Sequence, residues 1–148
     1  MQRLRYLPLL LACVLWAPFS AVAENSTTAG GFTVHYNALA TADLTPVVTR
    51  AYGIKRSKHR GMLNVSVIKK QEGATGTPVL AHVAAEIKAL TGQNARLSMR
   101  EIKEQGAIYY IGEFPIRNEE KVDFVIKVMP EGTSETFVVH MEQQFFTD

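Results

Sequence analysis

Residues 122–129 (VDFVIKVM) and 137–146 (FVVHMEQQFF) indicate the fold class most clearly, because apolar and polar side chains alternate along both stretches. Successive side chains of a β-strand point to opposite faces of its sheet, so this alternation predicts strands with one buried face. The intervening residues 130–133 (PEGT) are typical of a turn. The C-terminal part of the chain is therefore expected to form two consecutive strands.

Similar alternation predicts strands in most of the remaining chain. These strands are expected at residues 32–38, 62–69, 97–102 and 107–116, with turns at 73–78, 105–106 and 118–120. One short helix is expected over residues 47–52. Thr45 precedes it as an N-cap, Pro46 suits its first turn, and Gly53 ends it.

Residues 79–90 are consistent with either a strand or a helix. Two-residue alternation from Val79 to Ile87 favours a strand. A start at Thr77-Pro78, a stop at Gly92 and apolar residues at helical spacing favour a helix instead. We expect a strand, because the neighbouring segments are strands.

About seven short strands with turns between them predict an all-β fold. The expected architecture is an immunoglobulin-like antiparallel β-sandwich of about seven strands with one short helix. We expect a single β-sandwich domain over residues 32–148, preceded by a flexible N-terminal tail at residues 24–31. The cysteine pair and core tryptophan of antibody domains are missing from these residues.

The first 23 residues have the pattern of a secretory signal peptide. Two arginines precede a short apolar run over residues 7–19, and residues 21–23 (AVA) form a small-residue cleavage site. We therefore expect cleavage after Ala23 and a periplasmic mature protein with no integral membrane span. The alternatives are lipidation of Cys13, which ends a lipobox-like LLAC, and an uncleaved anchor, for which the apolar run is short.

The expected mature chain has a balanced charge. The 148-residue chain has sixteen lysines and arginines and fourteen acidic residues, and two of the arginines lie in residues 1–23. Fourteen charges of each sign therefore remain on 125 residues, which argues against a general nucleic-acid-binding or membrane-surface protein. The lone cysteine, Cys13, also lies in the signal peptide. The mature domain must accordingly be stabilised without disulfides, by packing and sheet hydrogen bonds.

The mature sequence has no motif that is typical of an enzyme. It has no cysteine nucleophile and no serine elbow, and Ser57 near His59 has no acidic neighbour to orient the histidine. Glu119-Glu120 lies in an expected turn and is interpreted as a solvated charge pair. We expect no catalytic residue and no cofactor, and therefore a non-enzymatic protein.

Histidine and methionine side chains would suit a copper site. The mature chain has four of each, with histidine at positions 35, 59, 82 and 140 and methionine at positions 62, 99, 129 and 141. They show no His-x-His, Met-x-Met or other metal-ligand spacing, so no metal-binding residue is assigned. A periplasmic carrier of a copper-type metal or a small ligand is kept as an alternative function, which requires these side chains to converge in the fold.

The sharpest local feature is the basic segment at residues 55–60 (KRSKHR), called the basic loop below. Clustered ammonium and guanidinium groups attract phosphates and carboxylates. We expect this loop to contact an unknown envelope protein or an anionic ligand, and no nucleic acid. The candidate partner-binding residues are Tyr52, Lys55, Arg56, Lys58, His59 and Arg60.

Two other interpretations stay open. The basic loop is an ordinary solvated surface if it pairs with acidic residues of its own domain, such as Glu119, Glu120 or Asp123. A sandwich also has unpaired sheet edges, and an envelope chaperone or accessory factor would bind an extended peptide there.

The sequence also resembles a known family. The likeness lies in residues 34–38 (VHYNA), 44–46 (LTP), 51–54 (AYGI), 56–58 (RSK), 63–67 (LNVSV), 101–103 (EIK), 107–111 (AIYYI), 113–114 (EF) and 145–146 (FF). These residues are similar to an uncharacterised family of small exported gammaproteobacterial proteins, a domain of unknown function. The resemblance implies a bacterial source, a periplasmic β-sandwich and a strand over residues 79–90. It implies no known activity and no catalytic residue.

Overall fold

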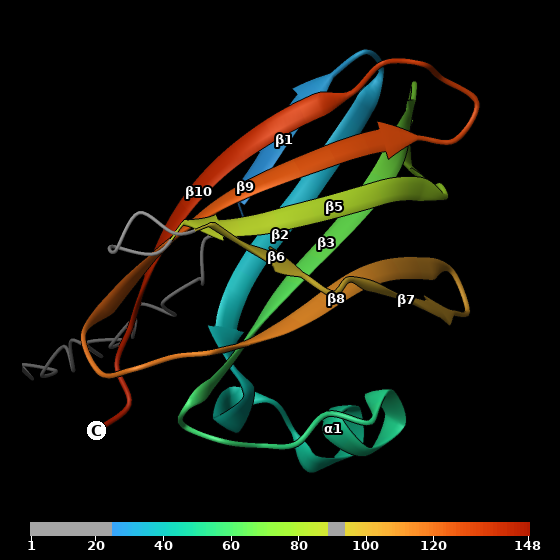
Figure 1. Cartoon of the computed structure of the whole chain (residues 1–148). Coiled ribbons are helices and arrows are strands. Elements are labelled where there is room, and N and C mark those ends of the chain that lie inside the picture. The colour runs from blue at the N-terminus through green and yellow to red at the C-terminus, as the bar shows by residue number, and fades with distance from the viewer. Residues whose placement is uncertain (1–24, 89–93) are drawn as a thin grey trace, which may run out of the picture.

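The computed structural model describes residues 25–88 and 94–148, which form ten strands, one α-helix and one 3₁₀ helix. The arrangement is shown in Figure 1. The elements are β1 (Asn25–Ala29), β2 (Phe32–Ala40), η1 (Thr41–Asp43), α1 (Pro46–Tyr52), β3 (Arg60–Gln71), β4 (Ala74–Pro78), β5 (Ala81–Lys88), β6 (Asn94–Leu97), β7 (Arg100–Glu104), β8 (Ala107–Pro115), β9 (Glu120–Pro130) and β10 (Phe137–Phe145).

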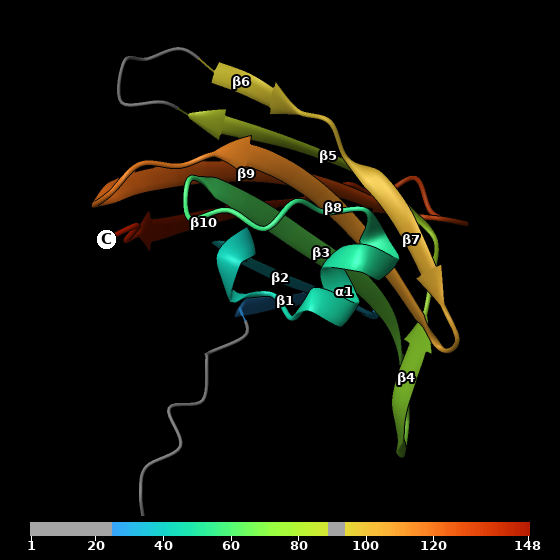
Figure 2. The ribbon, with the colours of Figure 1, turned by 90° about the horizontal axis from the view of Figure 1, so that it is seen from below.

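The strands form two antiparallel sheets that pack face to face. The first sheet has the order β1-β2-β3-β8-β7, with β4 paired to the end of β3, and the second has the order β10-β9-β5-β6. Figure 2 shows the two layers from below, with α1 beside β3 and β8. The expected all-β sandwich with one short helix is confirmed, although the described residues contain ten strands rather than about seven.

The core lies between the sheets and is built from the apolar face of each alternating strand. Leu63, Val65 and Val67 of β3 are completely buried, and so are Ile126 and Val128 of β9. Burying such side chains contributes about 1.5–3 kcal/mol each, so the inward face of each strand dominates the stability of the fold.

A second, smaller apolar cluster holds α1 against the outer face of the first sheet. Ile54, Met62 and Ile111 form its buried part, and Leu44 and Tyr52 pack against it. The helix follows the predicted signals: the Thr45 hydroxyl accepts a hydrogen bond from the Val48 amide at 3.4 Å, and Gly53 ends the helix with a left-handed φ of 64°. The α1 region is thereby fixed at one end of the sandwich.

Residues 24–31, expected to be a flexible tail, contain strand β1. Gly30 and Gly31 both have positive φ, 55° and 80°, and form the two-residue turn that joins β1 to β2. Thr28 and Thr33 face each other across this hairpin, with their hydroxyls 3.1 Å apart. The segment suggested a loose tail because its residues are small and polar, but the Gly30-Gly31 pair also favours a tight hairpin.

Two further strands account for the difference in strand number. Residues 73–78, expected to be a turn, contain β4, which pairs with β3 after a tight turn at Gly73, where φ is 71°. The single strand expected at residues 97–102 is two strands, β6 and β7. Ser98 and Met99 between them carry the chain from the second sheet to the first. The alternation of apolar and polar residues does not show that a chain passes from one sheet to another, so the sequence did not predict two separate strands here.

Of the ambiguous segment at residues 79–90, residues 81–88 form strand β5, as expected, and residues 79–80 lie outside any strand. β5 pairs with β9 on one side and β6 on the other, and these long-range hydrogen bonds outweigh the local helix signals. Residues 89–90 of that prediction, and the whole predicted signal peptide at residues 1–23, lie outside the described residues. Within the described ranges, no helix has the length and apolar character needed to cross a bilayer.

Candidate functional site

The basic loop links α1 to β3, and its backbone is held by one buried hydroxyl. Thr41 is completely buried in η1. Its Oγ1 lies 2.9 Å from the Lys55 carbonyl oxygen and 3.2 Å from that of Ser57, which share its proton, and it accepts a hydrogen bond from the Ser57 amide at 3.0 Å. The loop therefore has a defined shape, although most of its side chains are exposed.

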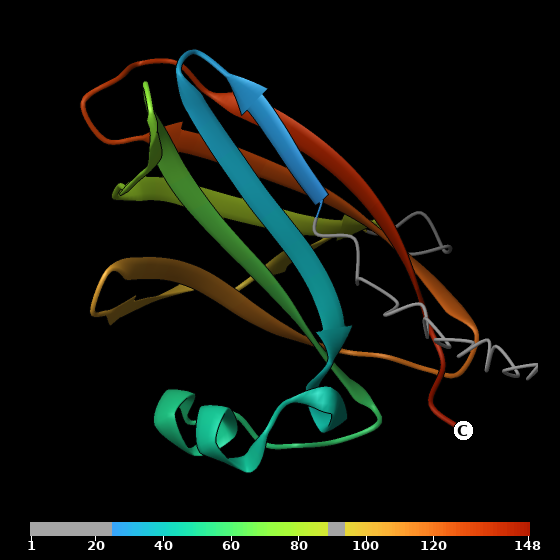
Figure 3. The ribbon, with the colours of Figure 1, turned by 180° about the vertical axis from the view of Figure 1, so that it is seen from behind.

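Further bonds fix the C-terminal half of the basic loop. The His59 amide donates to the Ser57 hydroxyl at 3.1 Å, and the His59 carbonyl accepts a hydrogen bond from the Ile116 amide at 3.1 Å. Figure 3 shows the loop running from α1 to the start of β3. Backbone groups that are already paired do not need to reorganise when a ligand arrives.

The five charged or titratable side chains of the loop divide into two groups. Arg56 donates from Nη2 to the Ala42 carbonyl at 2.6 Å, and Arg60 forms an ion pair with Glu113 at 3.4 Å. Lys55, Lys58 and His59 are exposed, and within the described residues no ion pair involves them. The Ala42 carbonyl carries no charge, so the uncompensated positive charge of the loop lies on Arg56 as well as on Lys55 and Lys58.

The acidic residues suggested as internal partners do not neutralise the loop. In the described part of the chain, no ion pair joins the loop to Glu119, Glu120 or Asp123. The Glu120 carboxylate instead accepts a hydrogen bond from the Arg117 amide at 2.8 Å, and Asp123 lies on β9 of the other sheet. The internal partner that the structure provides is Glu113 of β8, which the sequence analysis did not name.

Tyr52 holds α1 to strand β7. Its hydroxyl donates to the Glu104 carboxylate at 2.7 Å. Partial burial, followed by this hydrogen bond and the nearby negative charge, raises the pKa of Tyr52 to about 12. Arg100 of β7 donates to the Tyr52 carbonyl, which adds a cation beside α1. Arg100 was missed because it lies far from the basic loop in sequence and approaches it only through the folding of β7.

A small hollow adjoins the basic loop. It has a volume of about 170 Å³ and is lined by His59, Arg60, Glu113, Phe114 and Pro115. The hollow is too small for a large ligand, but it places a carboxylate, a guanidinium and an imidazole at one rim. Its charge is mixed, because Glu113 already pairs with Arg60.

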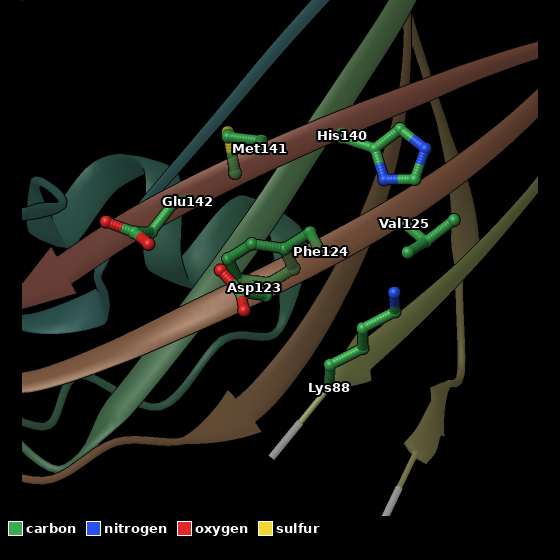
Figure 4. Close-up of a pocket in the computed structure, with 7 residues that line it drawn as sticks. All are labelled: Lys88, Asp123, Phe124, Val125, His140, Met141 and Glu142. Atoms are coloured by element: carbon green, nitrogen blue, oxygen red, sulfur yellow. The ribbon is translucent and has the colours of Figure 1, made fainter. Parts of the chain in front are cut away.

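The outer face of the second sheet contains another charged hollow, drawn in Figure 4. It has a volume of about 260 Å³ and includes Lys88, Asp123, His140 and Glu142. Asp123 lies opposite Glu142 on one neighbouring strand and opposite Lys88 on the other. Glu142 also pairs with Lys121 at 3.3 Å. The two neighbouring acids, Asp123 and Glu142, lie between Lys88 and Lys121, so charges of both signs meet at this hollow.

The histidines and methionines are largely dispersed. In residues 25–88 and 94–148, no group of three or more His, Cys, Asp or Glu side chains could hold a metal ion. One pair does meet: His82 of β5 lies directly opposite Met129 of β9, beside a hollow of about 380 Å³. Met62 and Met141 are buried in the apolar clusters, as expected for core methionines.

Comparison with known proteins identifies a family and a fold. A family model described as a domain of unknown function (DUF4426) matches residues 26–148. No curated protein matches the chain. The crystal structure of a DUF4426 family protein from Pseudomonas aeruginosa is 35% identical, with a TM-score of 0.70 over 84% of this chain and 96% of that chain.

Two more distant structures share the fold. FetP from a uropathogenic Escherichia coli strain is 12% identical, with a TM-score of 0.58 over 84% of this chain and 94% of that chain. A copper-bound variant of the same FetP is 11% identical, with a TM-score of 0.56 over 83% of this chain and 95% of that chain. At this identity the likeness shows the sandwich fold alone.

Proposed function

Because the chain belongs to the DUF4426 family, whose function is unknown, its role must be inferred from its own surface, and we propose a non-enzymatic binding module whose basic loop holds an anionic partner. The resemblance to a family of exported proteins, together with the predicted signal peptide, supports a periplasmic location for this module. The partner is then an acidic protein or a phosphate-bearing molecule of the cell envelope.

The observation that supports this proposal is the combination of a fixed backbone with free charges. Thr41 binds three backbone groups of the loop, while Lys55 and Lys58 stay exposed and without an ion pair in the described residues. Pre-ordering the loop lowers the entropic cost of binding, and free ammonium groups attract carboxylates and phosphates.

Charge reversal at Lys55 and Lys58 tests the proposal. We expect the double variant K55E/K58E to lose at least about tenfold in affinity for the partner, since like charges then face each other. The measurement is photo-crosslinking in cells from a photo-reactive residue at position 59, with identification of the captured species by mass spectrometry. A captured protein and a captured lipid distinguish the two sources of the anionic group.

The matched control is K69E/K70E, which reverses two exposed lysines near the far end of β3. This control makes the same change in net charge and should capture the partner as the unmodified chain does. Equal capture by both double variants would contradict the proposal, because the loss of charge in the loop would then have no specific effect.

Copper binding is a second candidate function, supported by the His82–Met129 pair. Side chains directly opposite each other in an antiparallel sheet have Cβ atoms about 4.5–5.5 Å apart, so an imidazole nitrogen and a thioether sulfur can reach one ion. Thioether and imidazole ligands suit copper(I). The copper-bound FetP variant shows that a protein of this fold has been seen with copper.

Titration with copper(I) against a competing chelator tests this second candidate. If it is right, one equivalent binds, and H82A and M129L each weaken binding at least about tenfold. H140A is the control, because His140 lies on β10 opposite Val125 and away from the pair. Binding that H140A weakens as much as H82A, or no stoichiometric binding at all, would exclude a site at His82 and Met129.

A further inference from the structure

A groove runs between the end of β2 and the end of β10. It has a volume of about 550 Å³. Figure 3 shows β1, β2 and β10 side by side there. The groove is lined mainly by apolar and amide side chains, with Asp43 as the charged member of a lining that includes Ala38, Leu39, Ala40, Phe145 and Phe146.

The backbone edge of β2 is open along this groove. β1 pairs with residues 32–36 of β2 and extends no further among the described residues. Residues 37–40 pair with β3 on their other edge. In the described chain, these four residues therefore have a strand on one side only, and an open strand edge presents unpaired amide and carbonyl groups.

The expected mature chain is too short to cover this edge itself. Asn25, the first residue of β1, lies opposite Tyr36, so β1 ends before Asn37. Cleavage after Ala23 leaves Glu24 as the single residue ahead of β1. The positions opposite Ala38, Leu39 and Ala40 then have no residue of this chain to fill them.

The side chains along the groove specify what fits it. Ala38 and Ala40 pack against the core between the sheets, so a strand beside them directs alternate side chains toward the core and Phe145. Because the methyl groups of Ala38 and Ala40 are small, a strand paired with this part of β2 has room for small apolar side chains opposite them. Phe146 is 67% exposed and lies at the groove, where it offers an apolar contact to a bound chain.

We propose that this groove binds an extended peptide segment of a partner protein, which adds to the first sheet in line with β1 and antiparallel to β2. Strand addition of this kind obtains affinity from backbone hydrogen bonds and specificity from alternate side chains. The segment has small apolar residues opposite Ala38 and Ala40. A basic residue at its N-terminal end approaches Asp43, which follows β2 in η1. The site is separate from the basic loop, so either proposal can fail without the other.

The test uses the exported protein and the synthetic peptide Lys-Ala-Val-Ala-amide at millimolar concentration, with backbone amides followed by NMR. The alanines of this peptide match Ala38 and Ala40 in register, and its lysine reaches the Asp43 end. We expect shifts at residues 37–40 and at least about tenfold slower hydrogen exchange of the amides among them that face the groove. D43K should weaken binding of the peptide, while E131K, a change of the same charge on an exposed acid of the turn after β9, should not.

The control peptide has the same sequence with methylated backbone nitrogens, which cannot donate to a strand ladder. Binding of the control as tight as that of the unmodified peptide would overturn strand addition.

Discussion

Replacing Phe124 with alanine is expected to lower the free energy of unfolding by about 3–5 kcal/mol. Phe124 is 1% exposed, at the centre of β9. Its ring meets that of Phe114 edge-on, with centroids 5.2 Å apart and planes at 69°. The substitution removes the ring that joins the inner faces of the two sheets and leaves a cavity that the close-packed core fills only partly. Urea denaturation followed by circular dichroism measures the loss.

Phe146 provides the matched control for this prediction. It is a phenylalanine near the end of β10 that is 67% exposed, so F146A should change the free energy of unfolding by less than about 1 kcal/mol. If F124A is too unstable to purify, F124L keeps most of the buried volume and should still cost about 1–2 kcal/mol. An F124A loss no larger than that of F146A would contradict the packing described here.

Replacing Thr41 with valine is expected to lower the free energy of unfolding by about 2–3 kcal/mol. Valine keeps the volume of threonine but removes the hydroxyl that binds the Ser57 amide and the Lys55 and Ser57 carbonyls. The Lys55 carbonyl and the Ser57 amide then lose this partner in a partly buried setting, while the Ser57 carbonyl still accepts a hydrogen bond from the Arg60 amide at 3.4 Å. We also expect faster hydrogen exchange at the Ser57 amide, because the substitution makes local opening of the loop easier in addition to lowering the stability of the whole domain.

Thr49 is the control for the threonine substitution. It is also buried, at 5% exposure, but its hydroxyl donates only to the Thr45 and Pro46 carbonyls within α1. The Thr45 carbonyl accepts the Thr49 amide as well, so T49V should cost less than about 1 kcal/mol. If T41V and T49V have equal effects, Thr41 does not have the special role that we assign to it in the loop.

The strands with regular alternation were predictable from sequence, because their side-chain period reports burial directly. β9 and β10 occur within two residues of their expected bounds, and β2, β3 and β8 contain the segments from which they were predicted, apart from the last residue of the segment at 107–116. β1 and β4 were missed, since both are short, mostly exposed and close to glycine turns. A period-two pattern cannot register strands that lack a buried face.

Some residues of the candidate site were likewise predictable from the sequence and others were not. The basic loop was evident from sequence because its charges are consecutive. Thr41, Glu113 and Arg100 were not, since each approaches the α1 region or the loop from a distant part of the chain. Internal pairing with Glu119, Glu120 or Asp123 was a reasonable expectation from net charge, but strand order places Asp123 on the second sheet. The sequence shows how many charges of each sign the chain has, but it does not show which of these charges form ion pairs in the folded protein.

The all-β class, the short helix with its caps and the concentrated basic segment were predictable from the amino-acid sequence, because each depends on residues that are neighbours in the chain. The three-dimensional arrangement was needed to place residues 81–88 in a strand, to bring His82 opposite Met129, and to leave residues 37–40 of β2 without a described strand on the edge beside β10. These features depend on register and sheet order, which arise from long-range hydrogen bonds and packing between segments that no local pattern connects.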